Sequence, residues 1–385
     1  MHGLAARWLA LLVVMLVASC SSGSTPAGST CGDESGDPMK PETGAWFGVS
    51  LDWEHDSLAS YVTRLGRSPA VVLAFAQVPV TAADRTNTAA AVEQARSFGA
   101  MLLLTLEPRG GLDLVTDDVV ADVAALLRDY NDDGVDVFVR FAHEMNGSWY
   151  PWSQDPDRYI TAFRRLATAV HDRAPRSKMM WAPNYGGGYP FAGGQFESEP
   201  GTSAFQLLDT NHDGSLTQAD DPYAPYFPGP EAVDWVGMSI YHWGNSYPWG
   251  ENEVPEPGKF HDFLRGTYNG AAGDEEAVPD FYGEYAHDLD LPLAVTETAA
   301  MYVPGGGGAD ELAVKQPWWS QVLAPHNDER LPMLRMVNWF EWKKFEPEVG
   351  TTVDWTVTFS PQTLPAFQSA LPTWLRFAGD VTRCP

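Results

Sequence analysis

Basic side chains are few in this sequence of 385 residues. Its 24 Lys and Arg stand against 51 Asp and Glu, so the formal net charge at pH 7 is −27. Because the field of such a chain repels phosphate backbones, we expect no nucleic-acid partner. A neutral polymer would not be repelled, so the acidity excludes one class of ligand without naming another.

Long apolar runs are scarce too, and the one near the N-terminus is short. Residues 8–18 are apolar throughout and follow Arg7, a pattern typical of a secretion signal and too short for a stop-transfer helix. The run ends just before Cys20, and a stretch rich in Ser, Gly, Thr and Pro follows it. This arrangement resembles a bacterial lipobox and predicts a signal peptide at residues 1–19 and a tether at residues 20–40, lipidated at Cys20. The alternative is an ordinary signal peptide with an incidental cysteine.

Cysteine occurs only three times in the whole sequence. Besides Cys20 there are Cys31 and Cys384, which flank the remaining chain at its two ends. The lipobox predicts a protein exported to the bacterial cell envelope, which contacts the membrane only through its lipid anchor. In that oxidising compartment we expect a disulfide between Cys31 and Cys384, with two free thiols as the alternative.

Eight apolar, β-rich runs follow the tether, and several are continuously apolar, as strands buried on both faces are. They span residues 46–51, 70–78, 100–106, 135–142, 178–182, 233–241, 293–296 and 333–340. Helical patterns lie at residues 84–98, 117–130, 157–173, 310–323 and 362–377. This alternation predicts an α/β fold, a (β/α)8 TIM barrel with long loops at the carboxyl-terminal face, where the active sites of such barrels lie. We expect residues 41–385 to form one catalytic domain and the protein to be a monomer.

Glu144 stands in the most informative segment, residues 139–152. A strand runs directly into His143 and Glu144, and a glycine and three aromatic residues follow. Hydrolysis of a glycosidic bond needs one carboxylic acid that protonates the leaving oxygen and one carboxylate opposite it. Glu144 is placed to be the acid, and a purely structural glutamate at a strand end is the alternative.

The second carboxylate should come from another strand end. The apolar run at residues 293–296 leads into Glu297, at the seventh predicted strand. Glu297 alone would be weak support, because barrel strands often end in polar residues. Paired with Glu144 on the fourth strand, it predicts two carboxylates about 5 Å apart, the separation used for retention of configuration.

The chain resembles glycoside hydrolase family 26, best known for β-mannanases. The resemblance rests on Arg140, on the run from His143 to Gly147, on Trp149 and Glu297, and on the strand at residues 233–241. Many related barrel glycosidases have Asn before the acid, whereas family 26 has His. The resemblance implies a (β/α)8 fold, retention of configuration, Glu144 as acid/base, Glu297 as nucleophile and no cofactor for catalysis.

By the same resemblance, further residues line the sugar site. Tyr241 would donate its hydroxyl to Glu297, and Trp339 would be the platform beneath the reacting sugar. The substrate-binding set is His143, Asn146, Trp149, Tyr241, Trp339 and Arg140. The alternatives are a structural His143, a loop anchor at Trp149 and a core residue at Trp339. Arg140 alternates onto the face of Glu144 and either buttresses the carboxylates or is a paired buried charge.

The predicted substrate is a polysaccharide, β-1,4-mannan first, cut at internal bonds. Family members also cut β-1,3-xylan and mixed-linkage β-glucan, and these remain alternatives because two loops, residues 185–189 and 243–249, match no substrate pattern. A protein that trims the cell's own envelope glycan is a further alternative. So is a non-catalytic lipoprotein that binds surface polysaccharide, although a binder has no need of two facing carboxylates.

Residues 209–220 follow the pattern of an EF-hand calcium loop. Oxygen-bearing side chains stand at the ligand positions, a glycine stands at the sixth position, and Asp replaces Glu at the twelfth. The predicted ligands of a structural calcium ion are Asp209, Asn211, Asp213, Ser215, Thr217 and Asp220. An Asx-rich surface turn is the alternative.

Overall fold

The computed structural model describes residues 39–270 and 277–381. Cys20, Cys31 and Cys384 lie outside these residues, so lipidation, export and the disulfide stay predictions. None of the helices in the described ranges is both long and apolar enough to cross a membrane.

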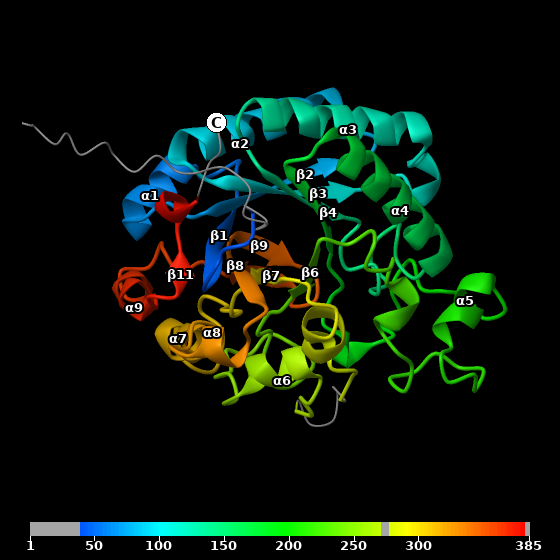
Figure 1. Cartoon of the computed structure of the whole chain (residues 1–385). Coiled ribbons are helices and arrows are strands. Elements are labelled where there is room, and N and C mark those ends of the chain that lie inside the picture. Colours follow the sequence, from blue (N-terminus) through cyan, green and yellow to red (C-terminus); the bar gives the residue numbers. More distant parts are fainter. Residues whose placement is uncertain (1–38, 271–276, 382–385) are drawn as a thin grey trace, which may run out of the picture. The chain divides into compact units, whose positions relative to one another are not determined.

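Eight parallel strands close into a barrel, because β8 pairs with β1 (Figure 1). In chain order they are β1 Ala45–Leu51, β2 Val71–Gln77, β3 Met101–Glu107, β4 Val137–Phe141, β5 Ser177–Trp181, β6 Trp235–Ser239, β7 Leu293–Thr298 and β8 Leu334–Glu341. A ninth strand of two residues, β11 Leu375–Arg376, also pairs with β1. The predicted (β/α)8 fold is thereby confirmed, and each predicted strand overlaps an observed one.

The helices surround the barrel. They are α1 Leu58–Leu65, α2 Ala82–Phe98, α3 Asp117–Asp132, α4 Pro156–Arg173, α5 Ser203–Leu208, α6 Lys259–Arg265, α7 Glu311–Val322, α8 Asn327–Arg330 and α9 Thr363–Ala370. Local signals start several of them: Thr81 and Asp84 form a capping box at α2, and Pro156 occupies the first turn of α4. The helix predicted at residues 362–377 is wrong beyond Ala370, because Pro372 cannot continue a helix and leaves Leu371 extended.

Two apolar layers form the core. One fills the barrel interior with side chains that include Trp46, Phe138, Trp235 and Met336. The other lies between the strands and the helices and includes Trp339 of β8. Successive side chains of a strand point to opposite faces, so a residue whose side chain lies in one layer has sequence neighbours whose side chains lie in the other.

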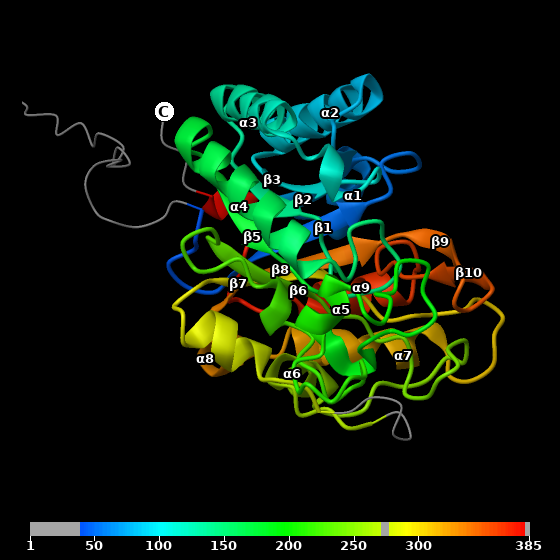
Figure 2. The same cartoon turned by 90° about the vertical axis from the view of Figure 1, so that its right-hand side faces the viewer.

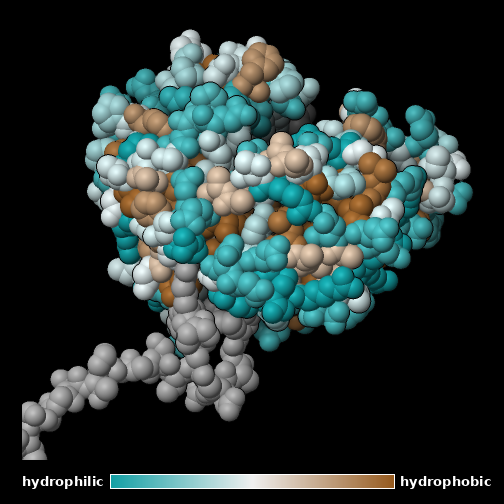
Figure 3. All heavy atoms as spheres, turned by 90° about the horizontal axis from the view of Figure 1, so that it is seen from above, coloured by the Kyte–Doolittle hydropathy of each residue, from teal (hydrophilic) through white to brown (hydrophobic). Residues whose placement is uncertain are grey.

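The long loops gather at the carboxyl ends of the strands, on the right in Figure 2. An antiparallel hairpin, β9 Lys343–Glu346 and β10 Thr351–Asp354, extends from β8 on this side. In Figure 3 this side is the upper edge of the molecule, and its outline is indented between two lobes. The surface shown there is mostly hydrophilic with small hydrophobic patches, as the strongly acidic composition leads one to expect.

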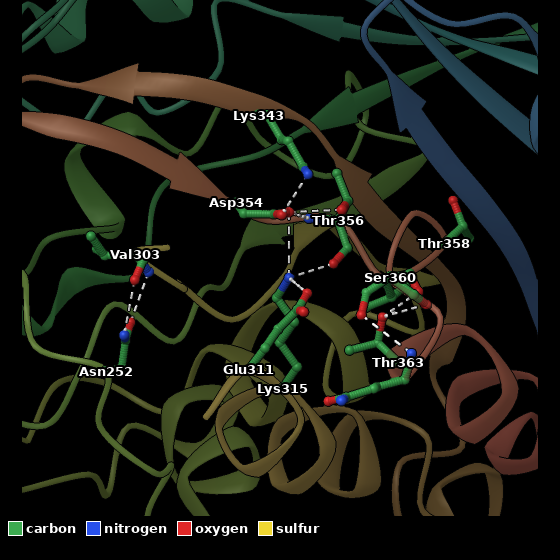
Figure 4. A network of polar contacts seen from close by, with 12 residues as sticks. Asn252, Val303, Glu311, Lys315, Lys343, Asp354, Thr356, Thr358, Ser360 and Thr363 are labelled. Atoms are coloured by element: carbon green, nitrogen blue, oxygen red, sulfur yellow. Dashed lines mark hydrogen bonds and ion pairs between the residues drawn. The ribbon is translucent and has the colours of Figure 1, made fainter. Parts of the chain in front are cut away.

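A buried lysine ties the hairpin to the barrel. Lys315 of α7 is fully buried, and its Nζ donates to Glu311 Oε1 at 2.7 Å and to the Thr356 carbonyl oxygen at 2.6 Å (Figure 4). The same nitrogen lies 3.4 Å from Asp354 Oδ1. A buried charge is tolerated only when paired and hydrogen-bonded, and these contacts meet that need. They also fix the end of β10 beside the strand ends.

Candidate active site

The segment after β4 carries backbone strain at the acid position. Ala142 and Glu144 have φ angles of 46° and 54°, a left-handed region that non-glycine residues rarely adopt. The neighbouring strands hold this conformation, because the Ala142 amide donates to the Leu106 carbonyl and the Glu144 amide to the Ala182 carbonyl. In this conformation Glu144 Oε2 lies 3.2 Å from Trp149 Nε1.

Glu144 is partly buried, and its pKa is raised to about 7. Burial is the largest cause, and the negative charge of Glu297 is the second. Hydrogen bonds from Ser239 and from Trp149 Nε1, the latter at 3.2 Å, act in the opposite direction, as does the charge of Arg140. The balance leaves a carboxyl group that is protonated in a large fraction of molecules near neutral pH.

Glu297 has different surroundings. The residue is 7% exposed, and both of its carboxylate oxygens accept hydrogen bonds. Arg140 Nη2 donates to Oε1 at 2.5 Å, and the Tyr241 hydroxyl donates to Oε2 at 2.6 Å. Burial and the negative charge of Glu297 raise the pKa of Tyr241 well above its usual value, so the phenol keeps its proton and stays a donor. The two donors hold the Glu297 carboxylate in a fixed orientation. The predicted link between Tyr241 and Glu297 is present.

Arg140 buttresses the carboxylates. It is fully buried inside the barrel, where its Nε donates to Thr105 Oγ1 at 2.9 Å in addition to its contact with Glu297. Of the two readings that the sequence left open, the geometry favours the buttress. Its full burial argues against a direct contact with sugar.

Trp149 lies at the acid, as expected of a residue that lines the site. Its side chain is 37% exposed, and its indole packs edge-on against Phe191 at 5.1 Å between centroids. A Cβ on Gly147 would stand 2.5 Å from the Trp149 ring, so only glycine lets the indole lie this close to the backbone. Trp149 is therefore held beside the backbone, partly open to solvent, while its nitrogen donates to Glu144.

His143 is buried among aromatic rings. Its ring centroid lies 5.1 Å from that of Tyr150 and 5.9 Å from that of Trp152, whose Nε1 donates to the His143 carbonyl at 2.8 Å. Burial holds the pKa of His143 well below its usual value, aided by the charges of Arg140 and Arg109. The imidazole is therefore neutral at the pH where Glu144 titrates, and it supports Tyr150.

Two predicted sugar-binding residues do not face a sugar. Asn146 is fully buried, and its side-chain amide makes two hydrogen bonds to the backbone of Asn184. Asn146 Nδ2 donates to the Asn184 carbonyl, and the Asn184 backbone amide donates to Asn146 Oδ1, both at 2.8 Å. It clamps the loops after β4 and β5 together. Trp339 is also fully buried and packs on Phe367 of α9, at 5.1 Å between centroids, so the prediction of a platform at Trp339 is wrong.

Instead of Trp339, a stacked pair of aromatic residues lies next to Tyr241, namely Phe340 near the end of β8 and Trp342 just after it. Phe340 and Trp342 stack at 5.7 Å with an interplanar angle of 7°, and Phe340 lies 5.7 Å from the Tyr241 ring. Trp342 is partly exposed, and its Nε1 donates to Ser50 Oγ at 3.3 Å. The strand alternation of side chains was the signal that could have found Trp342, once the inward face of β8 was known.

Sequence reasoning also missed a third carboxylate. Glu107 ends β3, is 5% exposed, and is held by Arg109, which donates to both of its oxygens at 2.8 Å. Burial raises the pKa of Glu107, while Arg109 opposes the increase. Burial raises the pKa of Tyr150, and so do the charges of Glu144, Glu107 and Glu297. An apolar strand ending in Glu was the available signal, the same one that marks Glu297.

The predicted calcium loop is folded on its own carboxylates. Asp209 accepts from the amides of Asp213 and Gly214 at 3.0 and 2.9 Å, and Asp220 accepts from the amides of Thr210 and Thr217 at 2.8 and 2.9 Å. Within residues 39–270 and 277–381, no three His, Cys, Asp or Glu side chains converge as metal ligands. The calcium site therefore stays a prediction, and the loop as described is ordered by Asx-type turns.

Residues 101–192 match the family model described as Glycosyl hydrolase family 26. This segment spans β3 to β5 and contains Glu144. Among curated proteins, the chain is 21% identical over 341 residues to Endoglucanase H of Acetivibrio thermocellus, an alignment that covers 85% of this chain and 30% of the relative. The chain thus spans about 30% of the length of that relative.

Solved structures share the fold. A modular endo-β-1,4-mannanase from Cellulomonas fimi superposes with a TM-score of 0.56 at 16% identity, over 90% of this chain and 74% of that one. The catalytic domain of a GH26 endo-β-1,4-mannanase from Bacillus sp. JAMB-750 gives 0.53 at 16% identity, over 88% of both chains. At these identities the likeness shows the (β/α)8 fold.

Proposed function

We propose that this chain is a family 26 glycoside hydrolase that cuts a β-linked polysaccharide with retention of configuration, using Glu144 and Glu297. The observation that carries the proposal is the contrast between the two carboxylates. One has a pKa near 7, and the other is held by two hydrogen-bond donors. Such a pair supplies the acid and the nucleophile that a double displacement needs. The family match to the segment around Glu144 supports the same reaction.

In the first step, a Glu297 oxygen attacks the anomeric carbon and forms a glycosyl ester. The bond from that carbon to the leaving oxygen breaks, and Glu144 transfers its proton to this oxygen. Arg140 and Tyr241 hold the Glu297 carboxylate in place, so little reorganisation is needed on attack. The raised pKa of Glu144 keeps the proton available at near-neutral pH.

In the second step, the proton balance reverses. Glu144, now a carboxylate, takes a proton from water, the water oxygen attacks the anomeric carbon, and the ester to Glu297 breaks. Because the ester has removed the negative charge of Glu297, one of the two causes of the raised pKa of Glu144 is gone. Its pKa therefore falls between the two steps, as a group that serves first as acid and then as base requires.

The substrate that we propose first is β-1,4-mannan, cut at internal bonds. The fold likeness to two endo-β-1,4-mannanases supports it. The curated relative named Endoglucanase H supports a second candidate, a β-glucan. The neutral charge of both polymers suits a chain of net charge −27, which would repel an acidic glycan.

A screen of the purified protein tests both candidates. Mannan, glucomannan, mixed-linkage β-glucan and β-1,3-xylan are incubated with the enzyme, the reducing ends released are measured, and the anomeric form of the first product is followed by NMR. We expect oligosaccharides of mixed length from mannan, with β-configured new ends. Products of inverted configuration would overturn the mechanism. Binding to a polymer without any release of reducing ends would favour a non-catalytic binding protein.

A further inference from the structure

The loop after β6 carries three aromatic residues that the proposed mechanism does not use. Trp243, Tyr247 and Trp249 follow Tyr241 within eight residues. Tyr247 is 63% exposed, and Trp243 and Trp249 are partly exposed. Large aromatic side chains are costly to expose to water, so a group of them on one loop calls for an explanation.

These rings form a series that begins at the active site. Trp243 lies 6.4 Å from Tyr241 and 4.8 Å from Trp355, both between ring centroids. The Trp249 ring lies against the backbone of Gly244, the residue after Trp243. A Cβ added to Gly244 would stand only 3.3 Å from Trp249 Cε3. Tyr247 then meets Trp249 edge-on at 5.8 Å. The aromatic ridge, defined as Trp243, Trp249 and Tyr247, thus runs from the partner of Glu297 out to solvent.

A buried lysine and a partly buried glutamate hold the near half of this loop. Lys259 is 2% exposed, and its Nζ donates to the Gly244 carbonyl at 2.6 Å. Glu253 Oε2 accepts from the amides of Asn245 and Ser246 at 2.6 and 3.0 Å. Since each of these contacts is made to the backbone, the loop conformation is fixed independently of the ridge side chains.

The far half is clamped to the loop after β7. Asn252 is 3% exposed, its Nδ2 donates to the Val303 carbonyl at 3.0 Å, and its Oδ1 accepts from the Val303 amide at 2.7 Å (Figure 4). The Asn252 carbonyl also accepts from the Ala309 amide at 2.8 Å. Because the loop is anchored at both ends, little conformational entropy is lost when a ligand binds to the exposed tyrosine. This rigidity favours a role as a binding surface.

We propose that the aromatic ridge binds sugar rings of the β-glycan chain at positions several residues away from the bond that is cut. This inference rests on the proposed function, and it adds a polymer-binding surface to it. Sugar rings present flat C–H faces that pack on aromatic faces, and the tyrosine and tryptophan polar groups can bond hydroxyls at the edge. The ridge is continuous with the active site, so its ligand should be the same glycan chain. A chain that passes Tyr241 at the nucleophile would reach Trp243 next.

The test compares a long substrate with a short one. Tyr247→Ala and the double variant Tyr247→Ala/Trp249→Ala are assayed on soluble mannan or on the best polymer found, and on an aryl glycoside that is too short to reach the ridge. We expect KM for the polymer to rise about threefold to tenfold per ring removed, since an aromatic contact contributes on this scale. The kinetic constants on the aryl glycoside should not change. Tyr247→Phe should restore polymer KM, and Leu207→Ala, which truncates another exposed apolar side chain, on α5, should behave as wild type.

Gel electrophoresis through immobilised polysaccharide measures binding without turnover and separates the two hypotheses. If the polymer retards wild type but not the double variant, the ridge binds polysaccharide. This result would support the ridge even if wild type released no sugar, whereas the lack of sugar release would overturn only the proposed function. Unchanged retardation and unchanged polymer KM in the double variant would overturn the ridge. So would a loss of self-association without any change in KM, which would assign the ridge to a second copy of the chain.

Discussion

Glu144 and Glu297 are the same residue type at the ends of two strands, yet their surroundings differ in nearly every respect. Glu297 has an arginine and a tyrosine on its two oxygens. Glu144 is buried beside a negative charge, and its neutral-side-chain donors are Ser239 and Trp149. The comparison shows how one barrel assigns two roles to one chemical group. Donors stabilise the charge on the nucleophile, and desolvation keeps the proton on the acid.

Removal of the nucleophile should have the largest effect. Glu297→Gln should lower kcat by at least about 10⁴-fold on every substrate, because no other group can form the ester. The protein should remain folded, but its melting temperature should fall because the buried Arg140 loses its charged partner. Glu231→Gln, which changes an exposed carboxylate, serves as the control. An activated fluoro-sugar should label Glu297, as peptide mass spectrometry would reveal. A label on any other carboxylate would move the nucleophile elsewhere.

Removal of the acid should depend on the substrate. Glu144→Ala should lose about 10²- to 10⁴-fold in kcat on polysaccharide, the scale of general acid catalysis. On an aryl glycoside with a good leaving group the first step needs little protonation, so ester formation should largely survive. Azide should then restore the second step and yield a β-configured glycosyl azide. Equal losses on both substrates, with no azide rescue, would contradict the assignment.

Much of this contrast follows from local patterns in the sequence. An apolar strand that ends in Glu must place that carboxylate at the barrel mouth, and strand alternation correctly turns Arg140 inward beneath it. The pattern fails at β8, because aromatic residues occupy neighbouring positions there. Nothing local says whether Trp339 or the pair Phe340 and Trp342 faces the barrel axis. That choice depends on the register of β8 against β1, which only the closed barrel fixes.

Partners distant in sequence were equally hidden. From the sequence alone, the Asn146 amide could bind a sugar hydroxyl as well as a protein group. Its actual partner is the Asn184 backbone, on a loop that only the fold brings next to it. The anchor of the hairpin of β9 and β10 is Lys315, which lies in α7, so no pattern near the hairpin in the sequence predicts its position. In both cases the missing quantity is a long-range contact between loops, where periodicity carries no information.

Weakening the surroundings of Glu297, rather than the residue itself, should have an intermediate effect. Tyr241→Phe removes one hydrogen bond to the carboxylate, and kcat should fall about 10- to 100-fold, since hydrogen bonds to charged groups contribute about 1.5–3 kcal/mol. Tyr268→Phe is a matched control, because the Tyr268 hydroxyl donates to Glu256 at 2.6 Å, a similar bond in the loops around α6. If both variants lost activity equally, the effect would be on the fold.

The smallest expected effect concerns the surroundings of Glu144, and it appears as a shift in pH dependence. Glu144 must be protonated to act, so kcat/KM should fall as the pH rises through its pKa of about 7. The indole N–H of Trp149 donates to the ionised carboxylate and so lowers this pKa, as do Ser239 and Arg140, while burial and Glu297 raise it. Trp149→Phe removes one lowering contribution, and the alkaline limb should move to higher pH by roughly half a unit to one unit. Trp342→Phe is the matched control, because its indole donates to Ser50 instead, so that variant should lose activity without moving the limb. A limb that moves to lower pH in Trp149→Phe, or that moves equally in both variants, would mean that Trp149 does not set the proton affinity of Glu144.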